Sequence, residues 1–323
     1  MAVVPAPVSS DAVDMKEAGP PDRARRSGRL RHPAVLGLVT ALAASAASIA
    51  LKLAVPTSLN LSGYDGLLFA RNATYLADGH WQGPYSLVTI AKGMGYPGFM
   101  AAAHTVGIPL AAAEQLAYLV AIAVLCGVVL AVTGRYAVAT VCFVFLALDP
   151  VNVGSASADV LRDNLYASQS LFFVSAAALT VLAVVRRARM VWVILAAVLC
   201  GAAGGFGWIT REEGPALLPP VLVLVALAWL CARTREPDRP AGWGPRLRRV
   251  VRPATALGVA VVAFAVPVLG VAAVNGHQYG AQLTNELGRA PSCGRTRTGP
   301  AWTSNRSCRG CRSTPSSAVW STR

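Results

Sequence analysis

Long apolar runs alternate with short polar segments along most of the chain. The first run, residues 34–55, is long enough to cross about 30 Å of hydrocarbon at about 1.5 Å per helical residue. Asp149 and Pro150 interrupt the third run. The pattern predicts an all-α, polytopic membrane domain over residues 34–286 with about seven transmembrane helices. The other predicted spans are 116–133, 136–153, 165–185, 190–209, 214–232 and 254–274.

The segment before the first span, residues 1–33, is polar and Pro-rich and ends in a cluster of arginines. This composition predicts a disordered cytoplasmic leader, because it offers too few apolar side chains to build a core. A secretory signal peptide is the alternative, since small residues are frequent over 43–47. The long polar leader and the length of the apolar run favour an uncleaved membrane anchor.

The stretch 97–113 decides the topology, because it is apolar but short and is broken by His104 and Pro109. If it does not cross, the leader and the later arginine clusters share the cytoplasmic side, as the positive-inside rule requires. If it crosses, every later cluster lies outside and the bias reverses. We therefore expect an interfacial or re-entrant half-helix within an outer loop of residues 56–115. The outer side then holds four basic residues ahead of the tail: Arg71, Lys92, Arg162 and Arg211.

The composition supports a membrane environment. Hydrophobic residues make up 54% of the 323 residues, charged residues make up 14%, and the mean hydropathy is +0.51. A soluble domain cannot bury that share of apolar material. A net charge of +14 is also typical of proteins that bind nucleic acid. The basic residues lie in short clusters between apolar runs and form no face interleaved with aromatics, so we expect no nucleic-acid partner.

The tail, residues 287–323, differs in character from the rest. From Gly288 onwards it contains seven arginines, no acidic residue and no hydrophobic periodicity. This composition predicts a disordered basic tail. An out-of-frame extension on a truncated membrane protein is the alternative. Cys308 and Cys311 have one further cysteine and no histidine near them, so we predict no metal site there.

Ionisable side chains beside membrane spans are costly to place and are default candidates for function. Carboxylates near guanidinium groups suit transfer chemistry on a phosphate-bearing lipid. A carboxylate can act as a general base or hold a divalent metal ion, and an arginine can clamp a phosphate. Alternatively, these charges merely neutralise one another in short loops. The candidates on the predicted outer side are Tyr64 with Asp65; Lys92; Asp159, Arg162 and Asp163; and Arg211, Glu212 and Glu213.

Four short motifs containing these residues are similar to motifs of the polyprenyl-phosphate-sugar-dependent glycosyltransferases of the C superfamily, mannosyltransferase- and arabinosyltransferase-like integral membrane proteins. The resemblance covers residues 34–286, matching the N-terminal membrane half of such proteins. One position differs, because the family often has a second acidic residue where this chain has Gly66. The motifs are Gly63-Tyr64-Asp65, Lys92-Gly93-Met94-Gly95-Tyr96-Pro97, Leu161-Arg162-Asp163-Asn164-Leu165-Tyr166 and Thr210-Arg211-Glu212-Glu213-Gly214.

The resemblance implies transfer of a sugar from a polyprenyl-phosphate donor to an acceptor on the outer face of a bacterial cell membrane. Asp65 would be the catalytic base that activates an acceptor hydroxyl. Arg211, with Arg162 or Lys92, would bind the donor phosphate. Glu212 and Asp163 would belong to the same substrate-binding set. The implied partners are the lipid-linked sugar and membrane lipids, and the need for a divalent metal ion stays open.

Two other classes of function fit the same residues. In a transporter or flippase component the charges would line a substrate path, although we find no internal repeat of the kind common in transporters. A non-catalytic membrane fragment would fit the unusual tail and the small number of spans.

Overall fold

The computed structural model describes residues 23–58, 64–86, 88–154, 158–211 and 243–284, with residues 219, 222, 225 and 226 between the last two ranges. The chain divides into two units, Met1–Gly288 and Arg289–Arg323. The predicted tail, the predicted leader up to residue 22 and nearly all of the predicted span 214–232 lie outside the described residues.

The first unit is helical. Six of its helical segments are long and apolar enough to cross a membrane: Pro33–Ala54, Leu110–Thr133, Tyr136–Val153, Arg162–Val185, Met190–Thr210 and Val251–Tyr279. This confirms the prediction of an all-α membrane protein, and the count of seven spans stays a prediction. The helices are α1 (Arg23–Ala54), α2 (Tyr64–Ala77), α3 (Gly95–Val106), α4 (Leu110–Thr133), α5 (Tyr136–Ala147), α6 (Pro150–Val153), α7 (Arg162–Val185), α8 (Met190–Thr210) and α10 (Trp243–Tyr279).

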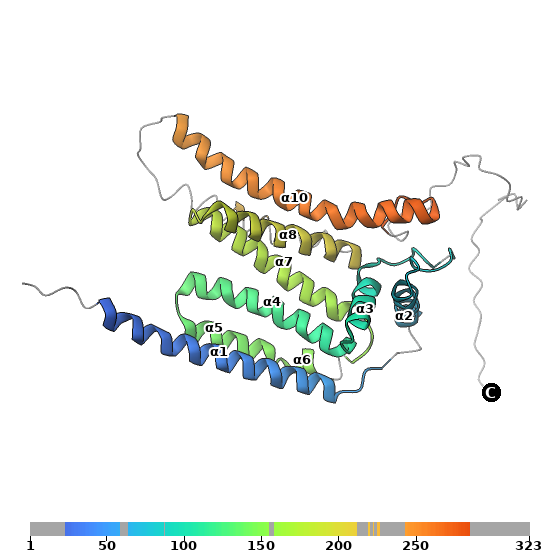
Figure 1. Ribbon diagram of the computed structural model, residues 1–323, viewed down its shortest axis with the longest axis horizontal. Coiled ribbons are helices and arrows are strands. Elements are labelled where there is room, and N and C mark those ends of the chain that lie inside the picture. Colours follow the sequence, from blue (N-terminus) through green and yellow to red (C-terminus); the bar gives the residue numbers. More distant parts are fainter. Residues whose placement is uncertain are drawn as a thin grey trace, which may run out of the picture. The chain divides into compact units, whose positions relative to one another are not determined.

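The long helices run in both directions between the two ends of the bundle. At one end α1, α8 and α10 finish, α4 and α7 begin, and the short helices α2 and α3 lie (Figure 1). We call this the α2–α3 end. The opposite end carries Arg135 between α4 and α5, and Arg186, Arg187 and Arg189 between α7 and α8. There Arg252 Nη1 of α10 donates a hydrogen bond of 3.2 Å to the carbonyl of Ala188.

Glycine and proline set several helix ends. α3 stops at Gly107, whose φ of 77° is a left-handed conformation that glycine adopts without steric cost. Pro109 then precedes α4.

The interruption predicted in the third span is also observed. α5 ends at Ala147, and Asp149 caps the one-turn helix α6 by accepting a hydrogen bond of 3.1 Å from the Val151 amide.

The helix bounds differ from the sequence prediction in three places. α1 begins at Arg23, so the expected disordered leader is helical over its last residues; arginine has good helix propensity, and the following span extends the helix backwards. α2 lies within the expected outer loop and was not predicted as a helix. The expected half-helix 97–113 is divided by Gly107 and Pro109, so its last residues start α4.

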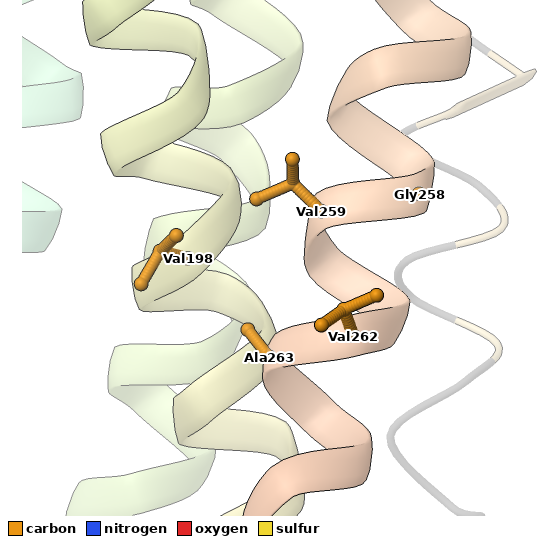
Figure 2. A pocket seen from close by; sticks show the side chains of 5 residues that line it. All are labelled: Val198, Gly258, Val259, Val262 and Ala263. Carbon is orange, nitrogen blue, oxygen red and sulfur yellow. The ribbon is translucent and has the colours of Figure 1, made fainter.

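The glycine-rich segment of α8 permits close packing against α10. A Cβ added at Gly201 would come within 2.1 Å of the Ala260 carbonyl oxygen, and one at Gly205 within 2.4 Å of the Phe264 carbonyl oxygen. Small residues allow helix backbones to approach in this way. Figure 2 shows an open apolar groove between the same two helices, lined by Val198, Gly258, Val259, Val262 and Ala263.

Candidate functional site

An apolar cluster supports the α2–α3 end. Its buried members come from α2, from α3, from the segment before α7 and from α7 itself: Phe69, Tyr96, Val160 and Leu165. The rings of Phe69 and Tyr96 meet edge to face with centroids 5.3 Å apart. Aromatic pairs in this geometry are favourable. Three segments that carry candidate residues, α2, the start of α3 and the start of α7, therefore share one core.

Two glycines bring the segment that carries Lys92 against the end of α8. A Cβ added at Gly93 would lie 2.2 Å from the Ile209 carbonyl oxygen, and one at Gly95 would lie 2.9 Å from Thr210 Cα. Real Cβ atoms are not found so close to backbone atoms, so any larger residue would push the two segments apart. Arg211 follows Thr210 directly, and Lys92 therefore lies near the same helix end.

The candidate charges form two ion pairs at this end. Lys92 Nζ lies 3.2 Å from Asp65 Oδ2, and the two side chains are 22% and 43% exposed. Arg211 pairs with Asp163 through Nη1 and Oδ1, and its guanidinium carbon lies 5.3 Å from the centroid of the Tyr166 ring. Cations are attracted to the face of such a ring. Each pair joins residues from different motifs that sequence reasoning had singled out separately.

The exposure of these pairs bears on their chemistry. Ion pairs in contact with solvent contribute little to stability, so their partners can be exchanged at low cost. A phosphate entering between Lys92 and Arg211 could accept hydrogen bonds from each cation and release its carboxylate partner. Released from Lys92, the Asp65 carboxylate could accept a proton from a nearby hydroxyl.

The other predicted residues have different surroundings. Arg162 is the first residue of α7 and is half-buried. The Asp159 carboxylate accepts a hydrogen bond of 2.5 Å from the Ser58 hydroxyl, beside an isolated bridge between the two backbones. Asp159 therefore holds the segment after α1 to the segment before α7. Glu212 and Glu213 lie outside the described residues.

Sequence reasoning missed a buried polar cluster beneath the site, around Glu114 in the first turns of α4. Glu114 is 6% exposed. Its Oε1 accepts a hydrogen bond of 2.7 Å from the Tyr96 hydroxyl, and its Oε2 accepts one of 3.3 Å from Asn164 Nδ2. Its place next to a predicted span was the available signal, since a charge at that depth needs partners.

The neighbouring Gln115 extends the cluster to α1 and α6. Its amide donates a hydrogen bond of 2.6 Å to Ser48 Oγ and accepts one of 3.0 Å from Asn152 Nδ2. Lys52 Nζ of α1 donates to the Asn152 carbonyl at 3.2 Å and is 4% exposed. Lys52 and Glu114 are thus both buried, and each charge has its opposite nearby.

Burial changes the chemistry of Tyr96, which lies on α3 outside the candidate spans. Burial of the phenol raises the pKa of Tyr96 above its ordinary value, and the adjacent Glu114 carboxylate, which accepts its hydrogen bond, raises it further. Tyr96 therefore stays protonated and donates to Glu114 across the physiological range.

The segment between α2 and α3 is attached to α10 just after α2 ends. Trp81 Nε1 donates a hydrogen bond of 2.8 Å to Asn275 Oδ1. The Tyr279 hydroxyl donates toward the carbonyl oxygens of Trp81 and Gly83, each 2.7 Å away. The loop leading to Lys92 is therefore held at both ends, by α10 at one and by α8 at the other.

In the described ranges, no group of three or more His, Cys, Asp or Glu residues could hold a metal ion.

No protein-family model matches the chain, and neither a curated protein nor a solved structure matches it. The assignment of function therefore rests on the residues of the site and on their motifs.

Proposed function

We propose that the chain is a membrane-embedded glycosyltransferase that moves a sugar from a polyprenyl-phosphate donor to an acceptor at the α2–α3 end of the bundle. The observation that carries this proposal is the close packing of Gly93 and Gly95 on Ile209 and Thr210. It brings a lysine and an arginine from two motifs to one helix end, each paired with a carboxylate. Two cations whose carboxylate partners can be exchanged for a phosphate suit the displacement of a phosphate leaving group.

The proposed roles follow from the charges. Lys92 and Arg211 bind the donor phosphate, Asp163 orients Arg211 in the unliganded state, and Arg162 and Glu212 complete the polar surroundings of the substrate. Asp65 removes the proton from the acceptor hydroxyl. The acceptor oxygen then bonds to the anomeric carbon as the bond from that carbon to the phosphate oxygen breaks. Polyprenyl phosphate leaves with the electron pair.

The side of the membrane follows from the distribution of arginines. Arg135, Arg186, Arg187 and Arg189 lie at the end opposite to α2 and α3. Cytoplasmic loops collect such residues, so we place that end and the N-terminus in the cytoplasm and the site on the outer face of the cell membrane. A donor carried by a polyprenyl lipid would reach the site from within the bilayer.

The test is transfer of labelled sugar from a panel of polyprenyl-phosphate donors by membranes that contain the full chain. We expect Asp65→Asn to lower kcat by about 100-fold or more, because the base is removed while the size is kept. We expect Arg211→Ala to raise KM for the donor and to lower kcat. The measurement is the initial rate as a function of donor concentration.

Two matched variants control for charge loss at the same end. Asp78→Asn changes an exposed aspartate just after α2, and Arg71→Ala changes an exposed arginine of α2 that lies over the Tyr75 ring. Both should transfer sugar at the wild-type rate. Equal losses in the site variants and the controls, or no transfer by an inserted wild-type chain, would reject the enzyme and favour a transporter component or a non-catalytic fragment.

A further inference from the structure

Glu114 is connected to two of the motifs at the site at once. Each of its carboxylate oxygens accepts one hydrogen bond, from Tyr96 at 2.7 Å and from Asn164 at 3.3 Å. Tyr96 belongs to the segment that carries Lys92, and Asn164 follows Asp163 in the chain. The buried Glu114 carboxylate thus links the segment that carries Lys92 to the segment that carries Asp163.

The contacts around these two donors make the connection specific. The Asn164 amide also donates a hydrogen bond of 3.1 Å to the Asp159 carbonyl, which fixes the turn that leads into α7. Tyr96 is fully buried and packs its ring edge to face on Phe69 of α2, the helix that carries Asp65 in its first turn. A shift of the Glu114 carboxylate would therefore be transmitted to three of the four charged residues in the ion pairs.

Residues of α1 and α6 surround Glu114 and Gln115 on α4. Gln115, the next residue, bonds to Ser48 of α1 and to Asn152 of α6, and Lys52 supplies a positive charge nearby. A buried carboxylate is costly in a membrane protein unless it is paired and hydrogen-bonded. All of these partners belong to segments that carry none of the residues proposed to touch the substrate, so they anchor Glu114 to the rest of the bundle.

We propose that Glu114 is a positioning residue of the sugar-transfer site, which acts through Tyr96 and Asn164 to set the distance between Lys92 and the Arg211–Asp163 pair. This inference rests on the proposed function. Glu114 does not touch substrate, because it is almost fully buried and both of its oxygens already accept hydrogen bonds. Its loss should misplace the two phosphate-binding cations relative to each other without removing either.

The activity test compares Tyr96→Phe and Glu114→Gln with Tyr118→Phe in the full chain. Tyr118 is a matched control, because it lies on the same helix as Glu114 and its hydroxyl donates a hydrogen bond of 3.1 Å to the Leu146 carbonyl of α5, a helix that carries no proposed substrate-binding residue. We expect Tyr96→Phe and Glu114→Gln to lower kcat/KM by about 10- to 100-fold, since misplaced groups lose much of their effect. Tyr118→Phe should stay within about twofold of wild type.

A double variant separates positioning from general destabilisation. If Glu114 acts through Tyr96, Tyr96→Phe combined with Glu114→Gln should lose no more activity than the worse single variant. The inference would be contradicted if the activity loss of the double variant equalled the product of the two single losses. Equal activity losses in Tyr96→Phe and Tyr118→Phe would also contradict it. Asn164→Asp should also lower activity, because it places a second carboxylate against Glu114 Oε2.

Hydrogen exchange of the full chain in lipid nanodiscs gives a reading that does not depend on transfer. We expect exchange in peptides covering 88–98 and 158–166 to rise about tenfold in Tyr96→Phe and to stay at the wild-type rate in Tyr118→Phe. Unchanged exchange in Tyr96→Phe would overturn the positioning role. If wild type transfers no sugar while exchange responds as expected, the proposed function fails and the role of Glu114 in holding these two segments stands.

Discussion

At the residue scale, the side chain with the most informative surroundings is Tyr96. It is fully buried, it donates to a carboxylate, and its pKa is raised by burial and by that carboxylate. The unfolded chain ionises a tyrosine near pH 10. Because the folded-state pKa is higher, Tyr96 contributes stability that is fully present below that pH and is lost as the pH rises toward the folded-state pKa.

We predict that Tyr96→Phe changes the alkaline stability profile. Near neutral pH the variant should be less stable by about 1.5–3 kcal/mol, the worth of a hydrogen bond to a charged group. Above about pH 10 wild type should lose up to about 1.4 kcal/mol per pH unit that the variant does not lose, so the two curves should converge. Denaturant unfolding in detergent between about pH 8 and 11.5 measures this. Parallel curves would show that Tyr96 titrates alike in both states.

At the element scale, the position of α3 depends on the absence of a side chain at its first residue, Gly95. Gly95, its first residue, lies where a Cβ would meet Thr210 of α8, whereas Gly98 on the same helix has only the Met94 side-chain methyl in reach, at 3.8 Å. α3 therefore docks on α8 through its first residues, and its later glycine has room for a methyl group.

We predict opposite effects for two glycine-to-alanine changes on α3. Gly95→Ala should destabilise the protein by about 1–3 kcal/mol, as overpacking does. Gly98→Ala should stabilise it by about 0.5–1 kcal/mol, because alanine favours the helix and meets only a flexible side chain. Thermal unfolding in detergent gives the two shifts, and sugar transfer should fall with Gly95→Ala alone. Equal shifts in both variants would show that α3 does not rest on α8.

At the scale of the whole molecule, the two ends of the helical unit differ in charge and in architecture. The arginine-rich loops lie at one end, and the short helices α2 and α3 with the candidate site lie at the other (Figure 1). α3 has 12 residues and is not among the segments long enough to cross a membrane. Both ends of α3 should therefore face the same side.

We predict that cysteine labelling reports this topology. In a chain whose seven native cysteines are replaced, Asp78→Cys before α3 and His104→Cys in its last turn should react with an impermeant maleimide on intact cells. Arg135→Cys and Arg186→Cys should react only after the membrane is opened. All four positions are exposed. Labelling of His104→Cys from the cytoplasmic side would mean that α3 crosses and that the arginine clusters lie outside.

The sequence by itself determined the helical membrane architecture and the residue types at the site. A helix that crosses a bilayer must satisfy its backbone internally and present an apolar surface, so each span is visible as a local run. The break at Asp149 and Pro150 was visible as an interruption of such a run. α2 was not, because it is a short helix with polar residues, and short helices depend on packing rather than on their own propensity.

Only the tertiary structure decided which charges meet. The pairing of Lys92 with Asp65 and of Arg211 with Asp163 joins segments that no local pattern links, and Glu114 was not among the candidates from the sequence. Side chains far apart in sequence come together only through the packing of the helices that carry them. The depth of a charge is visible in the sequence, whereas its partner depends on where the other helices place their own polar groups.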